Sequence, residues 1–221
     1  MTGTIAAARM RCVLVCALFI LVSAALTHAQ EPPPRIPFIV ADVHGSVPRF
    51  PSDPALADSR NLTLSELPGA GFGGQVGVHI YPFRWRAITF GIGGEVAGSR
   101  SRFTPPDDSS VDLQSTEEKF LSAAPQLSFN FGNGHGWSYL SGGIGVSQWS
   151  LIPDGREPYP GDTERLKTIN YGGGARWFPR RHLAFSFDVR FYAINPGTGY
   201  LGHPGSPRTT LLIIGAGVSL K

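Results

Sequence analysis

Leu183-Ala184-Phe185-Ser186-Phe187-Asp188-Val189-Arg190-Phe191-Tyr192 places an apolar side chain at every second position, with smaller or polar side chains between. Successive side chains of a β-strand point to opposite faces, so this stretch predicts a strand with one apolar and one largely polar face. Seven further stretches repeat the pattern. The predicted strands are 36–46, 71–82, 87–99, 119–131, 137–149, 166–178, 183–194 and 209–220.

The first 29 residues have the features of a cleaved secretory signal peptide. Arg9 and Arg11 precede an apolar run, Cys12 to Leu26, that is too short to span a bilayer as a helix. The small residue Ala29 then ends a cleavage site. The predicted organisation is a signal peptide at 1–29, a Pro-rich linker at 30–35 and one barrel domain at 36–221.

Removal of the leader changes both the charge and the cysteine content of the chain. Cys12 and Cys16 leave with it, so no disulfide is expected in the mature protein. The formal charge of +3 falls as Arg9 and Arg11 are lost, which leaves 17 basic against 16 acidic residues. This near-balance gives no reason to expect a nucleic-acid partner.

The connections between the predicted strands alternate between long and short. This is the arrangement of outer-membrane barrels, which have long extracellular loops and short periplasmic turns. The predicted fold is therefore all-β, an eight-stranded antiparallel up-and-down transmembrane β-barrel with its apolar faces toward lipid. A soluble lipocalin-like binder has the same strand count with the opposite polarity, and the alternating loop lengths favour the membrane.

Two short turns give testable details of strand register. Asn133-Gly134 predicts a type I′ hairpin turn, because that turn needs positive φ at both central residues. At the third short turn, the outward residues Tyr171, Ala175 and Trp177 are expected to pair with outward Phe185 and Phe187, which requires a connection of odd length. A slip of one residue in either turn would move every side chain to the wrong face.

The opening strand Phe38-Ile39-Val40-Ala41-Asp42-Val43 and the hairpin from Asn170 through Arg190 resemble the OmpA/OmpX-type outer-membrane β-barrel superfamily. The resemblance covers the whole mature chain. It implies an outer-membrane location and insertion by the barrel assembly machinery. The family commonly ends its last strand on an aromatic residue, whereas this chain ends Val218-Ser219-Leu220-Lys221.

Charged and polar side chains share the inward parity of the predicted strands. Eight strands enclose a lumen just wide enough for side chains to fill. These groups are expected to pair as a structural plug, with a gated ion path or proton relay as the alternative. The predicted lumen polar network is Asp42, His44, His79, Glu95, Arg176, Asp188 and Arg190.

Two further sets of residues are expected at the membrane boundaries. Aromatic residues bracket the short turns, and such rings favour the headgroup level. The predicted aromatic girdle is Tyr81, Trp85, Trp137, Tyr139 and Trp177. Basic residues lie at the opposite ends of the strands, where they are expected to meet lipopolysaccharide phosphates. This predicted collar is Arg100, Arg102, Lys119, Arg165, Lys167 and Arg208.

The expected function is that of a non-enzymatic surface or envelope protein, monomeric, in contact with outer-membrane lipids and lipopolysaccharide. No catalytic residues, metal site or cofactor is predicted. Gly69-x-Gly71-x-x-Gly74 matches a dinucleotide fingerprint, but a strand rather than a helix follows it. The alternatives are a narrow pore or transporter, and, with less support, a lipocalin-like binder or a barrel enzyme that modifies lipid A.

Overall fold

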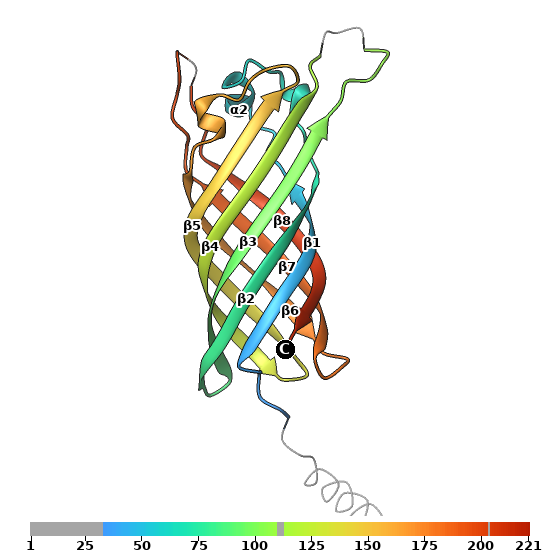
Figure 1. The fold of residues 1–221 in the computed structure, drawn as a ribbon, viewed down its shortest axis with the longest axis vertical. Coiled ribbons are helices and arrows are strands. Elements are labelled where there is room, and N and C mark those ends of the chain that lie inside the picture. Colours follow the sequence, from blue (N-terminus) through green and yellow to red (C-terminus); the bar gives the residue numbers. More distant parts are fainter. Residues whose placement is uncertain (1–32, 110–112, 203) are drawn as a thin grey trace, which may run out of the picture. The chain divides into compact units, whose positions relative to one another are not determined.

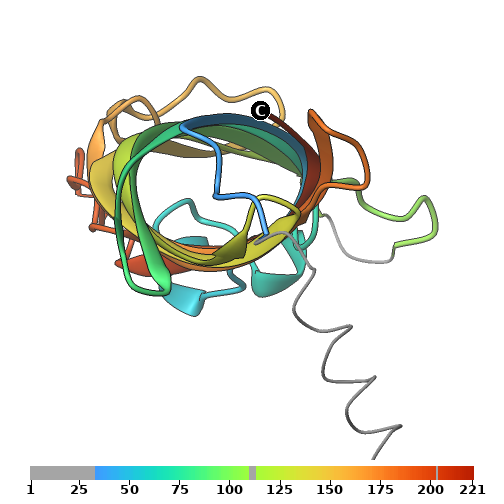
Figure 2. The same cartoon turned by 90° about the horizontal axis from the view of Figure 1, so that it is seen from below.

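The computed structural model describes residues 33–109, 113–202 and 204–221, and one compact unit runs from Arg35 to Lys221. The predicted signal peptide lies outside the described residues. Within them, eight antiparallel strands form a closed barrel in which β8 returns to β1 (Figures 1 and 2). The strands are β1 (Ile39–Arg49), β2 (Phe72–Trp85), β3 (Ile88–Phe103), β4 (Thr116–Asn133), β5 (Gly136–Pro153), β6 (Leu166–Trp177), β7 (Leu183–Ile194) and β8 (Thr209–Leu220).

Around the middle of the barrel the strands turn apolar side chains outward and place polar and charged side chains in the lumen. On β7, Phe187 is 43% exposed, whereas Ser186 and Asp188 on the other parity are buried. The same division holds on β4, where Leu127 and Phe129 face outward. An exposed apolar belt around a lumen that holds buried charges is the polarity of a transmembrane barrel, opposite to that of a lipocalin.

The helices do not contribute to crossing a membrane. None of the helices among the described residues is long and apolar enough to span one.

The strands β3, β4 and β5 extend beyond their predicted ends at the side of the long loops. They contain 16, 18 and 18 residues, whereas a tilted transmembrane strand needs about 9–11. The outward apolar residues of β4 begin at Leu121, so the segment from Thr116 to Lys119 stands above the apolar belt. Figure 1 shows this taller wall beside the loops.

The second short turn is centred one residue later than predicted, which changes the pairing register by two residues and keeps both apolar parities outside. Asn133 pairs with Gly136, so the central residues are Gly134 and His135. Neither Asn133 nor Gly134 has a positive φ, and the predicted type I′ turn is therefore wrong. Instead the Asn133 side chain accepts a hydrogen bond from the His135 N–H at 2.9 Å, which is a role typical of asparagine at the first turn position.

The third short turn has the predicted register. Trp177 pairs with Phe185 and Ala175 pairs with Phe187, so the connection has the odd number of residues that keeps both apolar parities outside.

The long loop between β1 and β2 is folded over the barrel mouth. It contains helix α2 (Pro54–Asp58) and the short 3₁₀ turn η2 (Leu64–Glu66), and the β5–β6 loop contains η3 (Pro160–Asp162). The sequence predicted only an irregular loop at 47–70. We call α2, η2 and the rest of the β1–β2 loop the lid; Figure 1 shows α2 at this end of the barrel.

Candidate functional site

The middle part of the lumen holds the charged side chains, above a buried cluster near the short turns that includes Tyr81, Trp137 and Phe178. The seven residues of the predicted lumen polar network all lie inside the barrel: Asp42, His44, His79, Glu95, Arg176, Asp188 and Arg190. They come from five strands, which the barrel closure brings within contact of one another. The alternation along each strand predicts that these side chains face the lumen, because residues two apart on a strand share a face.

The first centre of this network is the ion pair of Asp42 and Arg176. The Arg176 Nε and Nη2 atoms donate to the two Asp42 carboxylate oxygens at 2.8 and 2.6 Å. Ser219 donates a further hydrogen bond to the same carboxylate. The guanidinium lies over the ring of Tyr139, 4.1 Å from its centroid. This two-point pairing offsets part of the cost of burying both charges.

The second centre is Arg190 with two carboxylates. Its Nε atom lies 3.1 Å from Glu95 Oε2, and its Nη2 atom donates to Asp188 Oδ2 at 3.0 Å. The Tyr192 hydroxyl donates to Glu95 at 2.7 Å, and the Tyr139 hydroxyl donates to Asp188 at 2.7 Å. Each buried carboxylate therefore has both a guanidinium and a phenol partner.

The space left between the two centres is about 10 Å³. That is close to the smallest volume that holds a single water molecule. The polar side chains therefore fill this layer of the lumen, and we call them the polar plug.

The same layer contains a buried histidine and serine pair. His44 Nε2 lies 2.7 Å from Ser186 Oγ. Both side chains are inside the filled lumen, away from the lipid-facing wall where a lipid A substrate would approach. Among the described residues, no group of three or more His, Cys, Asp or Glu side chains is placed to hold a metal ion.

Above the polar plug the lumen is largely apolar, a feature that the alternation did not predict, and its buried acid Glu118 accepts a hydrogen bond from Trp149 Nε1 at 2.8 Å. Phe120, Trp149 and Tyr192 belong to one buried cluster, and Leu56 and Leu62 of the lid pack into the same cluster. The signal was present in the inward parity of β4 and β5, which changes from serine to aromatic residues toward the long loops. The lid therefore closes the mouth with an apolar contact.

Buried polar contacts fix the lid to the other loops. Arg60 is 3% exposed and its Nη2 atom donates to Asp162 in η3 at 2.8 Å. Asp162 also accepts the Leu151 N–H at 3.1 Å, so it joins the lid to β5.

Glu66 makes the corresponding contact with the β3–β4 loop. It accepts the N–H groups of Thr63 and Gln114, each at 2.7 Å. Burial alone would raise the pKa of Glu66, but these backbone donors hold it below its ordinary value. Two acids in the long loops, Glu66 and Asp162, therefore tie the lid to the neighbouring loops.

The predicted collar divides into two halves, and the half on β3 and β4 is paired internally. Arg100 and Lys119 lie opposite each other in register. Glu117 lies between them, with its oxygens 3.3 Å from Arg100 Nη2 and 2.6 Å from Lys119 Nζ. Arg102 forms an ion pair with Asp154. We call these three cations the paired half.

The other half of the collar forms no ion pair with an acid among the described residues. Arg165, Lys167 and Arg208 are exposed. None of them takes part in the ion pairs of the described residues: Arg60–Asp162, His79–Asp42, Arg100–Glu117, Arg102–Asp154, Lys119–Glu117, Arg176–Asp42, Arg190–Glu95 and Arg190–Asp188. We call these three the unpaired half.

The unpaired cations are also close together in the barrel wall. Thr168, Ile194 and Thr209 form one row across β6, β7 and β8. Lys167 and Arg208 each lie one residue beyond this row, on either side of the end of β7. Adjacent strands are about 4.8 Å apart, so both side chains reach one phosphate placed between them.

The predicted aromatic girdle is only partly on the lipid face. Trp85 and Trp177 are more than half exposed, as predicted. Tyr81, Trp137 and Tyr139 are at most 6% exposed and lie in the lumen, so their assignment to the girdle is wrong. The inward parity of β5 already placed Trp137 and Tyr139 inside.

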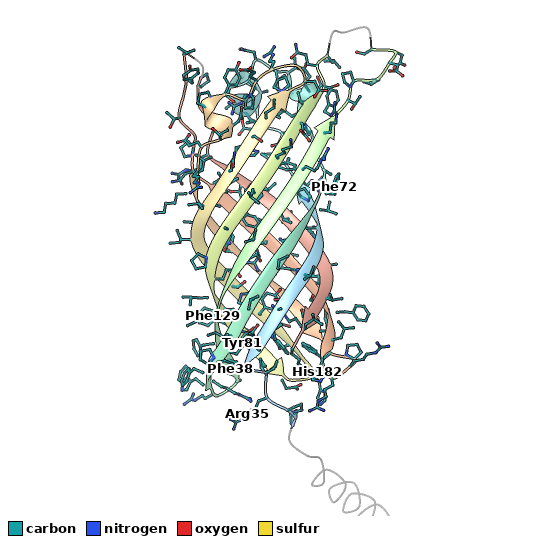
Figure 3. The ribbon with its side chains drawn as sticks, in the orientation of Figure 1. Arg35, Phe38, Phe72, Tyr81, Phe129 and His182 are labelled. Atoms are coloured by element: carbon teal, nitrogen blue, oxygen red, sulfur yellow. The ribbon has the colours of Figure 1, made fainter. Side chains whose placement is uncertain are left out.

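Other exposed aromatics complete the lipid-facing ring at the short-turn end. On β2 the register shifts between Ile80 and Phe83, so Tyr81 stays inside and Phe83 returns to the outer face. Phe38 and Phe185 are also strongly exposed at this end. Figure 3 labels Phe38 and Tyr81 at this end of the barrel.

Comparisons with known proteins identify the fold and leave the function open. No family model matches the chain, and no curated protein matches it. Among solved structures, Neisserial surface protein A is similar with 13% identity and a TM-score of 0.50, over 83% of this chain and 96% of that chain. At this identity the likeness shows the fold alone, and it agrees with the closed eight-stranded barrel of this chain.

Two further solved structures are similar at lower scores. Ail of Yersinia pestis has 15% identity and a TM-score of 0.43, over 83% of this chain and 97% of that chain. OprG from Pseudomonas aeruginosa has 8% identity and a TM-score of 0.47, over 85% of this chain and 98% of that chain.

Proposed function

We propose that this outer-membrane barrel is a non-enzymatic surface protein with a closed lumen, which contacts lipopolysaccharide phosphates through the unpaired half of its collar. In this proposal the barrel is a monomer inserted by the barrel assembly machinery, and its folded loops present the surface to external partners.

The proposal rests on the observation that side chains fill the lumen from the polar plug in its middle to the lid at its mouth. The ion pairs of Arg176 and Arg190 occupy the middle, with about 10 Å³ left between them. The apolar cluster and the lid fill the mouth. This filling favours interactions at the outer surface and the loops over transport through the lumen.

Planar-bilayer recording tests the closed lumen against the pore alternative. We expect no steady conductance from the wild-type barrel, because the polar plug and the lid must both rearrange before ions pass. Stable porin-sized openings would contradict the proposal. A variant that breaks one tie of the lid, Arg60→Gln, serves as a control: with the plug intact, it is also expected not to conduct.

The collar part of the proposal rests on which cations are free to bind an anion. In the paired half, Glu117 and Asp154 already occupy the guanidinium and ammonium groups, and a phosphate must displace them. In the unpaired half no such competitor is present. Below it the outer wall is apolar, with Ile169 and Tyr171 about half exposed, and it suits an acyl chain.

The two halves supply matched variants for a lipid-binding experiment. Replacing Arg165, Lys167 and Arg208 with Gln is expected to lower co-purifying lipopolysaccharide about tenfold or more, since each cation near an anionic lipid surface contributes about 1 kcal/mol. The remaining lipopolysaccharide should be released by salt.

The control variant carries Gln at the three cations of the paired half, Arg100, Arg102 and Lys119. It removes the same formal charge, and we expect a clearly smaller loss of lipopolysaccharide. An equal loss in both variants would show that internal pairing does not select the site. No loss in either, with normal heat modifiability on a gel, would contradict the collar proposal.

A further inference from the structure

The end of the barrel with the short turns carries basic side chains and no acidic ones. In its described segments, 33–38, 83–87, 132–136, 178–182 and 221, there is no Asp or Glu. The acids of the barrel wall lie inside the lumen or toward the long loops. We call the basic side chains of this end the basic rim: Arg35, Arg84, Arg86, Arg180, Arg181 and Lys221.

The charges of the basic rim are not neutralised within the protein. None of its side chains belongs to an ion pair among the described residues. Arg84 Nε donates to the Arg86 carbonyl at 3.0 Å, and Lys221 Nζ donates to the Gly134 carbonyl at 2.6 Å. These are contacts with neutral groups, so the rim keeps its positive charge.

Exposed aromatics fix the height of the rim relative to a bilayer. Trp85 lies between Arg84 and Arg86, and the Arg86 guanidinium is 5.3 Å from the Trp85 ring centroid. Trp177 is three residues before Arg180, and both Trp side chains are more than half exposed. Rings of this kind lie at the headgroup level. The neighbouring guanidiniums therefore lie at the depth of lipid phosphates.

The same order is repeated at the start of the barrel. Phe38 is 64% exposed on the outer face, and Arg35 precedes it by three residues. Figure 3 labels Arg35, Phe38 and His182 at this end. At three places around the barrel, an arginine thus lies within three residues of an exposed ring, which an isolated charged turn would not produce.

We propose that the basic rim binds the phosphate groups of phospholipids in the periplasmic leaflet, with preference for anionic phospholipids. Arginine suits this ligand because its planar group donates two parallel hydrogen bonds to phosphate oxygens. The short turns of outer-membrane barrels face the periplasm, so the rim meets the leaflet that lacks lipopolysaccharide. The barrel would then bind phosphate at both of its ends, through separate residues.

Lipid selectivity measured with spin-labelled phosphatidylglycerol tests the rim independently of the collar. All proteins in this experiment carry Gln at Arg165, Lys167 and Arg208. The unpaired half of the collar therefore cannot cause any preference for the anionic lipid over phosphatidylcholine that remains. The rim variant adds Gln at Arg84, Arg86, Arg180 and Arg181. We expect it to lose at least about threefold in selectivity, and we expect salt to remove the preference of the parent.

A matched variant separates charge from folding. Lysine at the same four rim positions keeps the charge and should retain most of the selectivity. Equal selectivity of the Gln variant and its parent would overturn the proposal, as would loss of selectivity in the Lys variant equal to that in the Gln variant.

Two further experiments distinguish a membrane phospholipid from a free phosphate compound and from peptidoglycan as the ligand of the rim. Free glycerophosphoglycerol should not compete, because only a membrane-anchored headgroup is held at this depth; competition at equal concentration would overturn the assignment to a lipid. The rim variant should also sediment with isolated peptidoglycan as its parent does. A loss there with unchanged lipid selectivity would assign the rim to peptidoglycan and contradict the proposal.

Discussion

Replacing Arg176 with alanine is expected to lower the free energy of unfolding by about 3–5 kcal/mol, because the Asp42 carboxylate then stays buried without its two-point partner. Arg176 is 2% exposed and fills the space beneath Tyr139 as well as pairing with Asp42. Urea titration of the barrel refolded in lipid vesicles measures the loss.

The matched control removes both charges at once. Asp42→Asn combined with Arg176→Met leaves no buried charge and keeps an extended side chain in the lumen. We expect this double variant to recover a substantial part of the stability lost in the single variant. A loss below about 1 kcal/mol for Arg176→Ala would mean that water reaches Asp42, and that the plug is not closed.

Placing arginine at Phe187 is expected to cost about 2–4 kcal/mol, because this outward position lies toward the middle of the lipid-facing wall of β7. Phe187 is 43% exposed and pairs across the wall with Ala175 and Ala216. The unfolding free energy in lipid vesicles is again the measurement.

The control is an arginine substitution at a second outward position of β7 that lies at a different depth in the membrane. Phe185 has the same parity on the same strand but lies closer to the short turn, at the level of Trp177. Arginine at Phe185 is expected to cost only about 0–1 kcal/mol, as it does near the interfaces. Equal costs at the two positions would show that the outer face of β7 does not experience a depth-dependent apolar medium.

Alternation along the strands is enough to predict the barrel, its closure with eight strands and the face of each lumen charge. This works because a period of two admits only two faces, and one face of each strand is strongly apolar. The prediction of the aromatic girdle fails at residues that were assigned to it because they lie near a turn, although the alternation along their strand places them on the inner face. Trp137 and Tyr139 lie near the short turns, yet their parity points inward, and the structure follows the parity.

Contacts between loops could not be predicted in the same way. The tie from Arg60 to Asp162 joins residues 102 positions apart, and no periodic pattern relates them. The pairing of Glu117 with Lys119 was easier to predict from the sequence, since residues two apart on a strand share a face. The short hairpin shows a finer limit: Asn133 is in the turn, but its side chain rather than its φ makes the turn.

The four tryptophans test the central claim, a membrane barrel with a filled lumen, most directly. Trp85 and Trp177 are 55% and 57% exposed, whereas Trp137 and Trp149 are 3% and 2% exposed. In single-tryptophan variants placed in vesicles with brominated lipids, we predict strong quenching of Trp85 and Trp177 fluorescence and little quenching of the other two. Equal quenching of Trp137 and Trp177, or no quenching of any of the four, would contradict the account.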